Sequence, residues 1–325
     1  MLSKSLLGLV VKDQLAEFDA LTDSVPRSQL SSFSSFKGSS AFVVKGVRRC
    51  GKSTLLKQFM KTNFLKDFYY FNFDDERVSG FTAEDFQPLI EVFLEIFGNQ
   101  KNILFDEIQN VDGWELFVNR LLRQGYRLFI TGSNANLLSK ELGTHLTGRH
   151  TDLELWPFSF VEFLKAINVP FSNNGFFSTN EKAILLRSFS NYFTRGGMPE
   201  PIVLLNDSIL IQVVSDIIQK DIVTRYRIRK PSGLKAVAKF LLSNVGNLIS
   251  YRSLVDNFGI SSNTVQNYIN YLEETFLIFT VRKFDRKIKR FDKNPKKVYC
   301  VDNGIVTKNT VSFNEKLCAL LENLV

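Results

Sequence analysis

The chain has 325 residues, enough for about two or three compact units, and 44% of them are hydrophobic, so it can bury sizeable cores. No stretch approaches the roughly 20 apolar residues of a membrane-spanning helix, and the N-terminal run LLGLVV is too short for a secretory signal. The widely spaced cysteines Cys50, Cys300 and Cys318 argue against a disulfide framework or a zinc site and favour a cytoplasmic location. The formal net charge of +8 favours anionic partners, though only weakly.

The first part of the chain predicts an N-terminal helix and loop over residues 1–40, followed by an α/β core over residues 41–160. Apolar runs typical of strands buried on both faces begin at Ala41, and they read AFVV, FYYFNF, NILF and RLFIT. Helix-like segments separate these runs: STLLKQFMK, AEDFQPLIEVFLEIF and WELFVNRLLRQ. Alternating strands and helices predict βαβ units and a parallel sheet.

The pattern changes after Pro157, where the strand signal fades. Residues 161–232 predict a helical extension, and residues 233–302 predict a winged-helix-like unit. Residues 303–325 are expected to begin a further domain of which the chain holds only the start.

The segment GVRRCGKS fits the phosphate-binding pattern G-x-x-x-x-G-K-[ST] between an apolar strand and a helix. Glycines let the backbone amides converge on an anion, Lys52 can reach the terminal phosphates of a nucleotide, and Ser53 can ligate Mg²⁺. The helix that follows adds the positive end of its dipole. We therefore predict that ATP and Mg²⁺ bind here, rather than that a glycine-rich surface turn lies here. The predicted cofactor-binding residues are Gly46, Val47, Arg48, Arg49, Cys50, Gly51, Lys52, Ser53 and Thr54.

The roles of the two arginines and of the cysteine in this loop each have an alternative interpretation. Arg48 and Arg49 either add positive potential to the loop or point into solvent. Cys50 is interpreted as a small loop filler rather than as a redox switch.

An acidic pair, Asp106 and Glu107, follows the apolar strand NILF directly. In P-loop ATPases a carboxylate at this place supports Mg²⁺, and an adjacent acid can deprotonate the attacking water. Such a pair at a strand end often has no function, but the phosphate loop upstream favours the functional interpretation. We predict that Asp106 supports the metal with Ser53 and that Glu107 activates water.

Three further residues are candidates for catalysis. The strand RLFIT ends in small polar residues, of which Ser133 or Asn134 would touch the γ-phosphate or the water, unless this is an ordinary strand exit. Arg149, in LTGRH, is either an arginine finger acting from a neighbouring subunit of a homo-oligomer or a solvated side chain. His145 and His150 have no ligand partners in the sequence and are interpreted as structural or surface groups.

The winged-helix-like unit is the candidate partner for double-stranded DNA. Its third helix, SSNTVQNYINYLEETF, places Val265, Ile269 and Leu272 at core spacing. The opposite face carries amides, which suit contacts with adenine, at Asn263, Gln266, Asn267 and Asn270. A basic excess over residues 282–297 suits phosphate contacts, although such a run is often a solvated loop. The arginines of TRYRIRK, Arg225, Arg227 and Arg229, are interpreted as a solvated linker.

The motifs GVRRCGKST, FDEIQNVDGWE, ITGSNANLLSKEL, LTGRHTDLELWPFSFVEFL and YFTRGGMPEP together resemble a prokaryotic ATPase family of the AAA+ superfamily. Its members pair an AAA core with a C-terminal domain of the DUF4143 type. The resemblance implies Lys52 and Ser53 at phosphate and magnesium, Asp106 and Glu107 as the Walker B pair, and Arg149 as a sensor or finger.

The leading hypothesis is therefore an ATPase that couples hydrolysis to a change in DNA or in a protein partner. The alternatives are a DNA-binding module that uses ATP as a ligand without hydrolysing it, and a remnant that only binds ATP.

Overall fold

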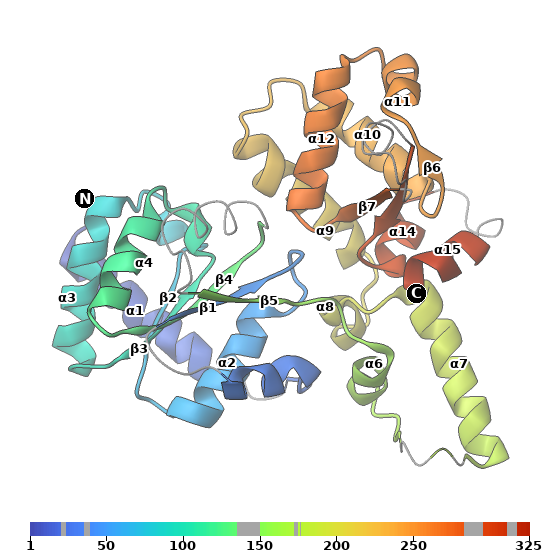
Figure 1. Ribbon diagram of the computed structural model, residues 1–325. Helices are drawn as coiled ribbons and strands as arrows, with labels where there is room; N and C mark the ends of the chain where they lie inside the picture. The colour runs from blue at the N-terminus through green and yellow to red at the C-terminus, as the bar shows by residue number, and fades with distance from the viewer. Residues whose placement is uncertain are drawn as a thin grey trace. The chain divides into compact units, whose positions relative to one another are not determined.

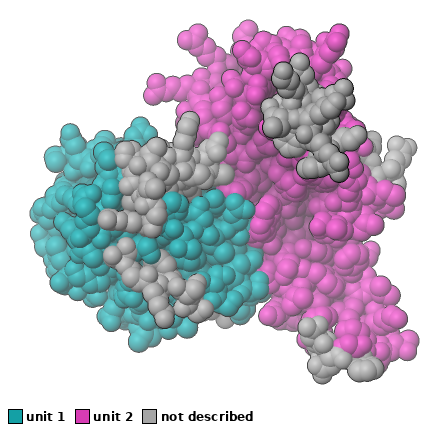
Figure 2. Space-filling view, in the orientation of Figure 1, with its two compact units in different colours: residues 1–46, 51–155 teal, residues 47–50, 156–325 magenta. Residues whose placement is uncertain are grey.

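A computed structural model describes residues 1–20, 24–35, 40–134, 150–171, 175, 177–282, 295–310 and 317–325 (Figure 1). These form two compact units, one of residues 1–46 and 51–155 and one of residues 47–50 and 156–325 (Figure 2). No helix in the described part of the chain has the length and apolar character needed to cross a membrane.

The first unit is built on a five-stranded parallel sheet with the strand order β2-β3-β4-β1-β5. Its strands are β1 (Ala41–Lys45), β2 (Tyr69–Asn72), β3 (Asn102–Asp106), β4 (Arg127–Gly132) and β5 (His150–Glu154). The first four are the apolar runs predicted from the sequence, so the predicted parallel α/β core is confirmed. The fifth was not predicted, because HTDLE is mostly polar and has no buried residue.

Helices cover both faces of this sheet, as its apolar strands require. One face packs against α1 (Lys4–Ala20), α3 (Phe86–Phe97) and α4 (Trp114–Arg123), and Val43 points into this core. The other face packs against α2 (Lys52–Phe64) and the 3₁₀ segment η1 (Ser28–Ser35). There the ring of Phe42 lies 4.2 Å from that of Phe33, centroid to centroid. Successive side chains of β1 thus pack into the two cores on opposite faces of the sheet.

Short 3₁₀ segments connect the strands to the helices that follow them. They are η2 (Glu76–Val78), η3 (Ala83–Asp85) and η4 (Ile108–Asn110). Asp85 is fully buried and accepts hydrogen bonds from the backbone nitrogens of Thr82 and Leu2. It therefore ties the N-terminus to the start of α3. The segment η4 follows the carboxyl end of β3 and belongs to the candidate site.

The second unit is mainly helical up to residue 230, as the sequence predicted. It contains α6 (Phe160–Ala166), α7 (Thr179–Arg195), α8 (Pro199–Val203), α9 (Ile209–Asp216) and the π-helical segment η5 (Ile217–Thr224). Ser159 and Ser178 begin α6 and α7 with capping boxes, which satisfy the first backbone amides of each helix.

Residues 231–300 have the helix and strand order of a winged helix. The elements are α10 (Pro231–Ser243), β6 (Leu248–Ile249), α11 (Tyr251–Phe258), α12 (Ser262–Glu274), β7 (Ile278–Arg282) and β8 (Lys296–Cys300). The strands form an antiparallel sheet in the order β6-β8-β7. Ser250 caps α11, and Gly259 ends it in the left-handed region. The two-residue strand β6 was not predicted.

The last described helices are α14 (Asn303–Asn309) and α15 (Leu317–Leu324). No local sequence pattern identifies a partner layer for the apolar side chains of α15, but Leu320 is only 2% exposed and therefore has one. Contacts of α15 with α7 and α14 provide that layer.

Candidate functional site

The phosphate loop runs from Gly46 to Ser53, between the end of β1 and the first turn of α2. Gly51 precedes α2 in the left-handed conformation, with φ 96°, and no side chain caps the first amides of the helix. These amides and the helix dipole are the elements of an anion site. Arg49 also has a positive φ, 63°. Such a conformation is costly for a residue other than glycine and is common at ligand sites.

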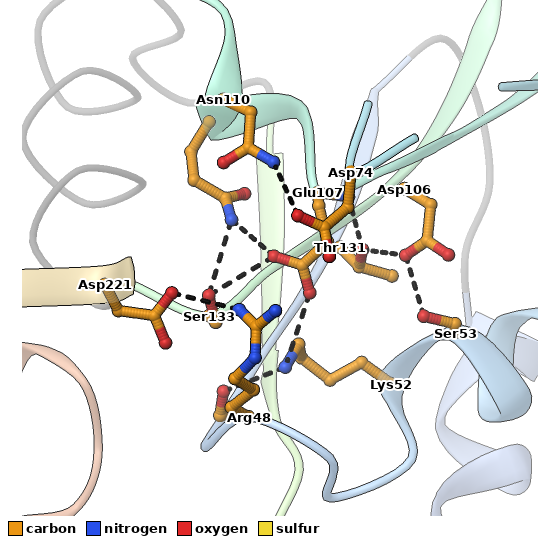
Figure 3. A network of polar contacts seen from close by, with 12 residues as sticks. Arg48, Lys52, Ser53, Asp74, Asp106, Glu107, Asn110, Thr131, Ser133 and Asp221 are labelled. Atoms are coloured by element: carbon orange, nitrogen blue, oxygen red, sulfur yellow. Dashed lines mark hydrogen bonds and ion pairs between the residues drawn. The ribbon is translucent and has the colours of Figure 1, made fainter. Parts of the chain in front are cut away.

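Lys52 is buried at the base of this loop, with 4% of its surface exposed. Its Nζ donates to the carbonyl oxygen of Gly46 at 3.1 Å and lies 3.7 Å from Glu107 Oε1 (Figure 3). The predicted phosphate-binding lysine and the predicted water-activating acid therefore meet, although they are far apart in the sequence.

The second predicted pair also meets. Ser53 Oγ donates to Asp106 Oδ1 at 2.8 Å, and Thr131 Oγ1 donates to the same carboxylate oxygen. Asp106 is 3% exposed. Burial raises the pKa of its carboxyl, the charge of Glu107 adds to this, and the hydrogen bonds from Thr131 and Ser53 oppose it.

The donor set of Ser53 and Asp106 fits Mg²⁺, which prefers hard oxygen ligands such as carboxylates and hydroxyls. The buried hydroxyl and carboxylate already lie within hydrogen-bond distance of each other. Ser53 directly follows Lys52 in the sequence, and Asp106 is the last residue of β3. A metal held by these two oxygens would lie beside the phosphates that the loop amides hold.

Glu107 directly follows β3 and has a left-handed backbone, with φ 53°. Its backbone nitrogen donates to Thr131 Oγ1 at 2.9 Å. Its Oε2 accepts hydrogen bonds from Ser133 Oγ, at 3.2 Å, and from Gln109 Nε2. One hydroxyl, that of Thr131, thus orders both acids of the pair.

The two candidates at the end of β4 have different surroundings. Ser133 is 1% exposed and contacts the carboxylate of Glu107. Asn134 is completely buried just after it. Arg149, the predicted finger, and His145 lie outside the described residues. His150 begins β5, where its Nε2 is 3.8 Å from Asp152 Oδ1.

The side chains of Arg48 and Arg49 form ion pairs with carboxylates instead of pointing into solvent. Arg48 Nη1 pairs with Asp221 Oδ1 at 3.0 Å, and both side chains are largely buried. Arg49 pairs with Glu200 at 3.3 Å and with Asp216 at 3.1 Å. These acids come from α8, α9 and η5, and residues 47–50 are accordingly grouped with the second unit.

Sequence reasoning missed three residues of this network, namely Gln109, Thr131 and Asp221. A weak signal was available for Thr131, a polar residue inside an otherwise apolar strand. The sequence around Gln109 has no comparable signal, since an amide in a short turn is common. Asp221 is 173 positions away from Arg48, and no local pattern joins them.

On α12, the amide face predicted from the sequence is present. Asn263, Gln266, Asn267 and Asn270 are all exposed, whereas Val265, Ile269 and Leu272 are buried. Of the predicted basic run, Arg282, Lys296 and Lys297 are described. Lys283, Arg286, Lys287, Lys289, Arg290 and Lys293 lie outside the described residues.

Comparison with known proteins assigns a domain family to the part of the chain that contains the candidate site. Residues 38–164 match the family model of an AAA domain. An uncharacterized protein of Haemophilus influenzae is 33% identical over 301 residues, which cover 87% of this chain and 72% of that protein. The chain belongs to this family of AAA-domain proteins.

A second part of the chain matches a domain whose role is unknown. Residues 186–315 match a domain of unknown function, DUF8612, and not the DUF4143 type that the motifs predicted. An uncharacterized protein of Methanocaldococcus jannaschii is 37% identical over 293 residues, or 87% of this chain. The chain spans 65% of the length of that relative. The AAA domain supports a nucleotide-binding, ATPase-like protein, and the relatives add no named activity.

Proposed function

We propose that the AAA-domain protein binds ATP with Mg²⁺ and hydrolyses it. The observation that carries this proposal is that the lysine of the phosphate loop lies at the carboxylate of Glu107, while Ser53 contacts Asp106. In this proposal the loop amides and Lys52 hold the phosphates, and Ser53 and Asp106 hold the metal. Bound Mg²⁺ would neutralise charge on the phosphates.

Further residues of the chain have the remaining catalytic roles in this proposal. Glu107 takes a proton from the attacking water, and Ser133 keeps its carboxylate oriented. Asn134 is proposed to contact the γ-phosphate. Arg149 stays a prediction, as a finger that acts from a neighbouring subunit of a homo-oligomer.

Two substitutions separate binding from hydrolysis. Lys52→Ala removes the ammonium group from the phosphates, so we expect loss of Mg²⁺-dependent binding of a fluorescent ATP analogue. Glu107→Gln keeps the shape of the side chain but cannot accept the proton, so we expect retained binding and a turnover lower by a factor on the order of 10² or more. The measurements are nucleotide titration and steady-state phosphate release.

Matched controls are Lys66→Ala and Glu84→Gln, which change exposed residues of the same types. Both are expected to bind and hydrolyse ATP as the unchanged chain does. Hydrolysis that persists at full rate in both site variants would remove the assignment.

We further propose that double-stranded DNA is a partner and that it contacts α12. The support is the exposed amide face of this helix, in a winged-helix arrangement that presents its third helix to the major groove. Phosphate release should then be measured with and without duplex DNA. A rate changed by DNA favours coupled hydrolysis. DNA binding that responds to ATP equally in the unchanged chain and in Glu107→Gln favours ATP as a ligand that is not hydrolysed.

A further inference from the structure

The side chain of Gln109 lies inside the candidate catalytic network, although nothing in the proposed function uses it. It belongs to η4, two residues after Glu107, and is 6% exposed. Its Nε2 donates to Glu107 Oε2 and lies 3.4 Å from Ser133 Oγ. Gln109 and Ser133 therefore hold the same carboxylate oxygen.

The orientation of this amide follows from chemistry. An ionised carboxylate only accepts hydrogen bonds, so the amide atom that faces Glu107 must be the nitrogen, which donates. The amide oxygen of Gln109 then points away from that contact. Flipping the amide would set two acceptors against each other.

The amide oxygen of Gln109 has an unusual environment for a buried hydrogen-bond acceptor. Gln109 Oε1 is buried, and none of the described residues donates a hydrogen bond to it. A buried acceptor without a donor costs about 1–3 kcal/mol, so native proteins seldom keep one away from a ligand site. Here it occurs beside the carboxylate that is proposed to activate water.

The other oxygen of Glu107 is differently placed. Oε1 lies 3.7 Å from Lys52 Nζ, whereas Oε2 is held by Gln109 and Ser133. In the proposed nucleotide complex Lys52 contacts the phosphates, and Oε2 keeps its contacts with Gln109 and Ser133. A water molecule has two protons, so it can donate one to Glu107 Oε1 and one to Gln109 Oε1.

We infer that Gln109 positions the attacking water: its amide nitrogen fixes Glu107, and its amide oxygen accepts a hydrogen bond from that water. This inference rests on the proposed hydrolysis of ATP. In that reaction the water oxygen forms a bond to the γ-phosphorus, and the bond from this phosphorus to the β,γ-bridging oxygen breaks. Glu107 takes the proton, and the products are ADP and inorganic phosphate.

The test is Gln109→Met, which keeps the length of the side chain but removes both amide groups. We expect the affinity for a fluorescent ATP analogue to stay within about threefold and the turnover to fall by a factor on the order of 10², with little change in KM. Gln109→Glu is the second variant, in case the first does not fold. It keeps the shape but replaces the donor with an acceptor, so the same loss is expected.

A readout without turnover distinguishes positioning from folding. ADP with beryllium fluoride mimics the bound ground state, and ADP with aluminium fluoride mimics the transition state that includes the water. We expect the Gln109 variants to bind the first as the unchanged chain does and to lose affinity for the second in proportion to turnover. The matched control is Asn110→Ala in the same turn, because Asn110 Nδ2 contacts the carbonyl oxygen of Phe73 at 3.3 Å instead of Glu107.

The outcomes separate the two proposals. If the unchanged chain hydrolyses ATP and Gln109→Met matches it, the inference about Gln109 is wrong and the proposed function stands. Equal loss of affinity for both analogues would also contradict the inference. If the unchanged chain does not hydrolyse ATP, the proposed function fails, and the inference fails with it.

Discussion

Three buried or partly buried acids of this chain accept hydrogen bonds from different kinds of donor. Asp106 and Glu107 share the hydroxyl of Thr131, which donates to the first and accepts from the backbone of the second. Asp302, in the second unit, accepts from the backbone nitrogen of Gly197 at 2.6 Å and from that of Ile305 at 3.2 Å. Backbone donors thus stabilise the buried carboxylate of Asp302, whereas the carboxylates of Asp106 and Glu107 accept hydrogen bonds from side chains.

Asp302 provides a prediction on pH. Its burial raises the pKa of the carboxyl to about 6, although hydrogen bonds from backbone amides act in the opposite direction. The folded chain therefore binds this proton more tightly than the unfolded chain. The contribution of Asp302 to the free energy of unfolding should fall by roughly 3 kcal/mol as pH rises from about 4 to about 7. Urea denaturation across this range measures it.

The comparison with Asp302→Asn isolates this effect, because the variant lacks the titrating group. The stability of the unchanged chain relative to the variant should therefore decrease over that pH range. Asp207→Asn is the control of opposite sign. Despite desolvation, the hydrogen bonds and ion pairs with Arg195 and Lys308 lower the pKa of Asp207, so its contribution is lost as pH falls. A constant difference between the unchanged chain and Asp302→Asn would contradict the prediction.

Among the elements, β4 decides the geometry of the site. It lies between β1, which leads into the phosphate loop, and β3, which ends in the acidic pair. Thr131 and Ser133 at its carboxyl end therefore contact the acids. A second decisive element is the π-helical segment η5, since π-helical turns are frequent at functional sites. It places Asp221 against Arg48 of the phosphate loop.

The ion pair between η5 and the loop gives a prediction on stability. Asp221→Ala leaves the guanidinium of Arg48 without its carboxylate in a largely buried place, so we expect the free energy of unfolding to fall by about 3 kcal/mol. Replacing both residues, as Arg48→Met with Asp221→Leu, should recover most of the loss. Urea denaturation of the single and double variants measures the coupling.

The control for this pair is Asp256→Ala, which breaks the highly exposed pair of Arg252 and Asp256. A solvated pair contributes little, so its unfolding midpoint should not change measurably. Asp221→Ala with an unchanged midpoint would show that the buried pair contributes nothing to stability.

The chain as a whole combines an AAA domain, a second helical and antiparallel β part, and an excess of positive charge. It carries 41 lysines and arginines against 33 acids. On α12, by contrast, the exposed positions 263, 266, 267 and 270 carry only neutral amides. In the proposed DNA contact, cations and amides have separable roles. Cations bind the phosphates whatever the DNA sequence is, whereas amides form hydrogen bonds with the base edges.

This separation can be measured through salt. We expect the affinity for duplex DNA to fall as salt rises, because bound cations release counterions from the phosphates. Asn267→Ala should weaken binding roughly tenfold at every salt concentration, without changing the slope. Arg252→Ala, which removes an exposed cation of α11, should reduce the slope by about one. Fluorescence anisotropy of a labelled duplex gives both quantities.

Gln212→Ala changes an exposed amide of α9 and is the matched control for Asn267. It should bind like the unchanged chain. Affinity that does not depend on salt, or a loss in Gln212→Ala equal to that in Asn267→Ala, would count against DNA as the partner of α12.

The amino-acid sequence was sufficient for everything that depends on neighbours along the chain. It predicted the phosphate loop, the acidic pair and four of the five strands, because glycine placement and apolar periodicity act locally. It missed β5, which has no apolar run, since its place is set by pairing with β1. Only the tertiary structure brought Gln109 to Glu107, Thr131 to Asp106 and Asp221 to Arg48. These contacts depend on strand order and on the packing of distant segments, and no local pattern of residues encodes either.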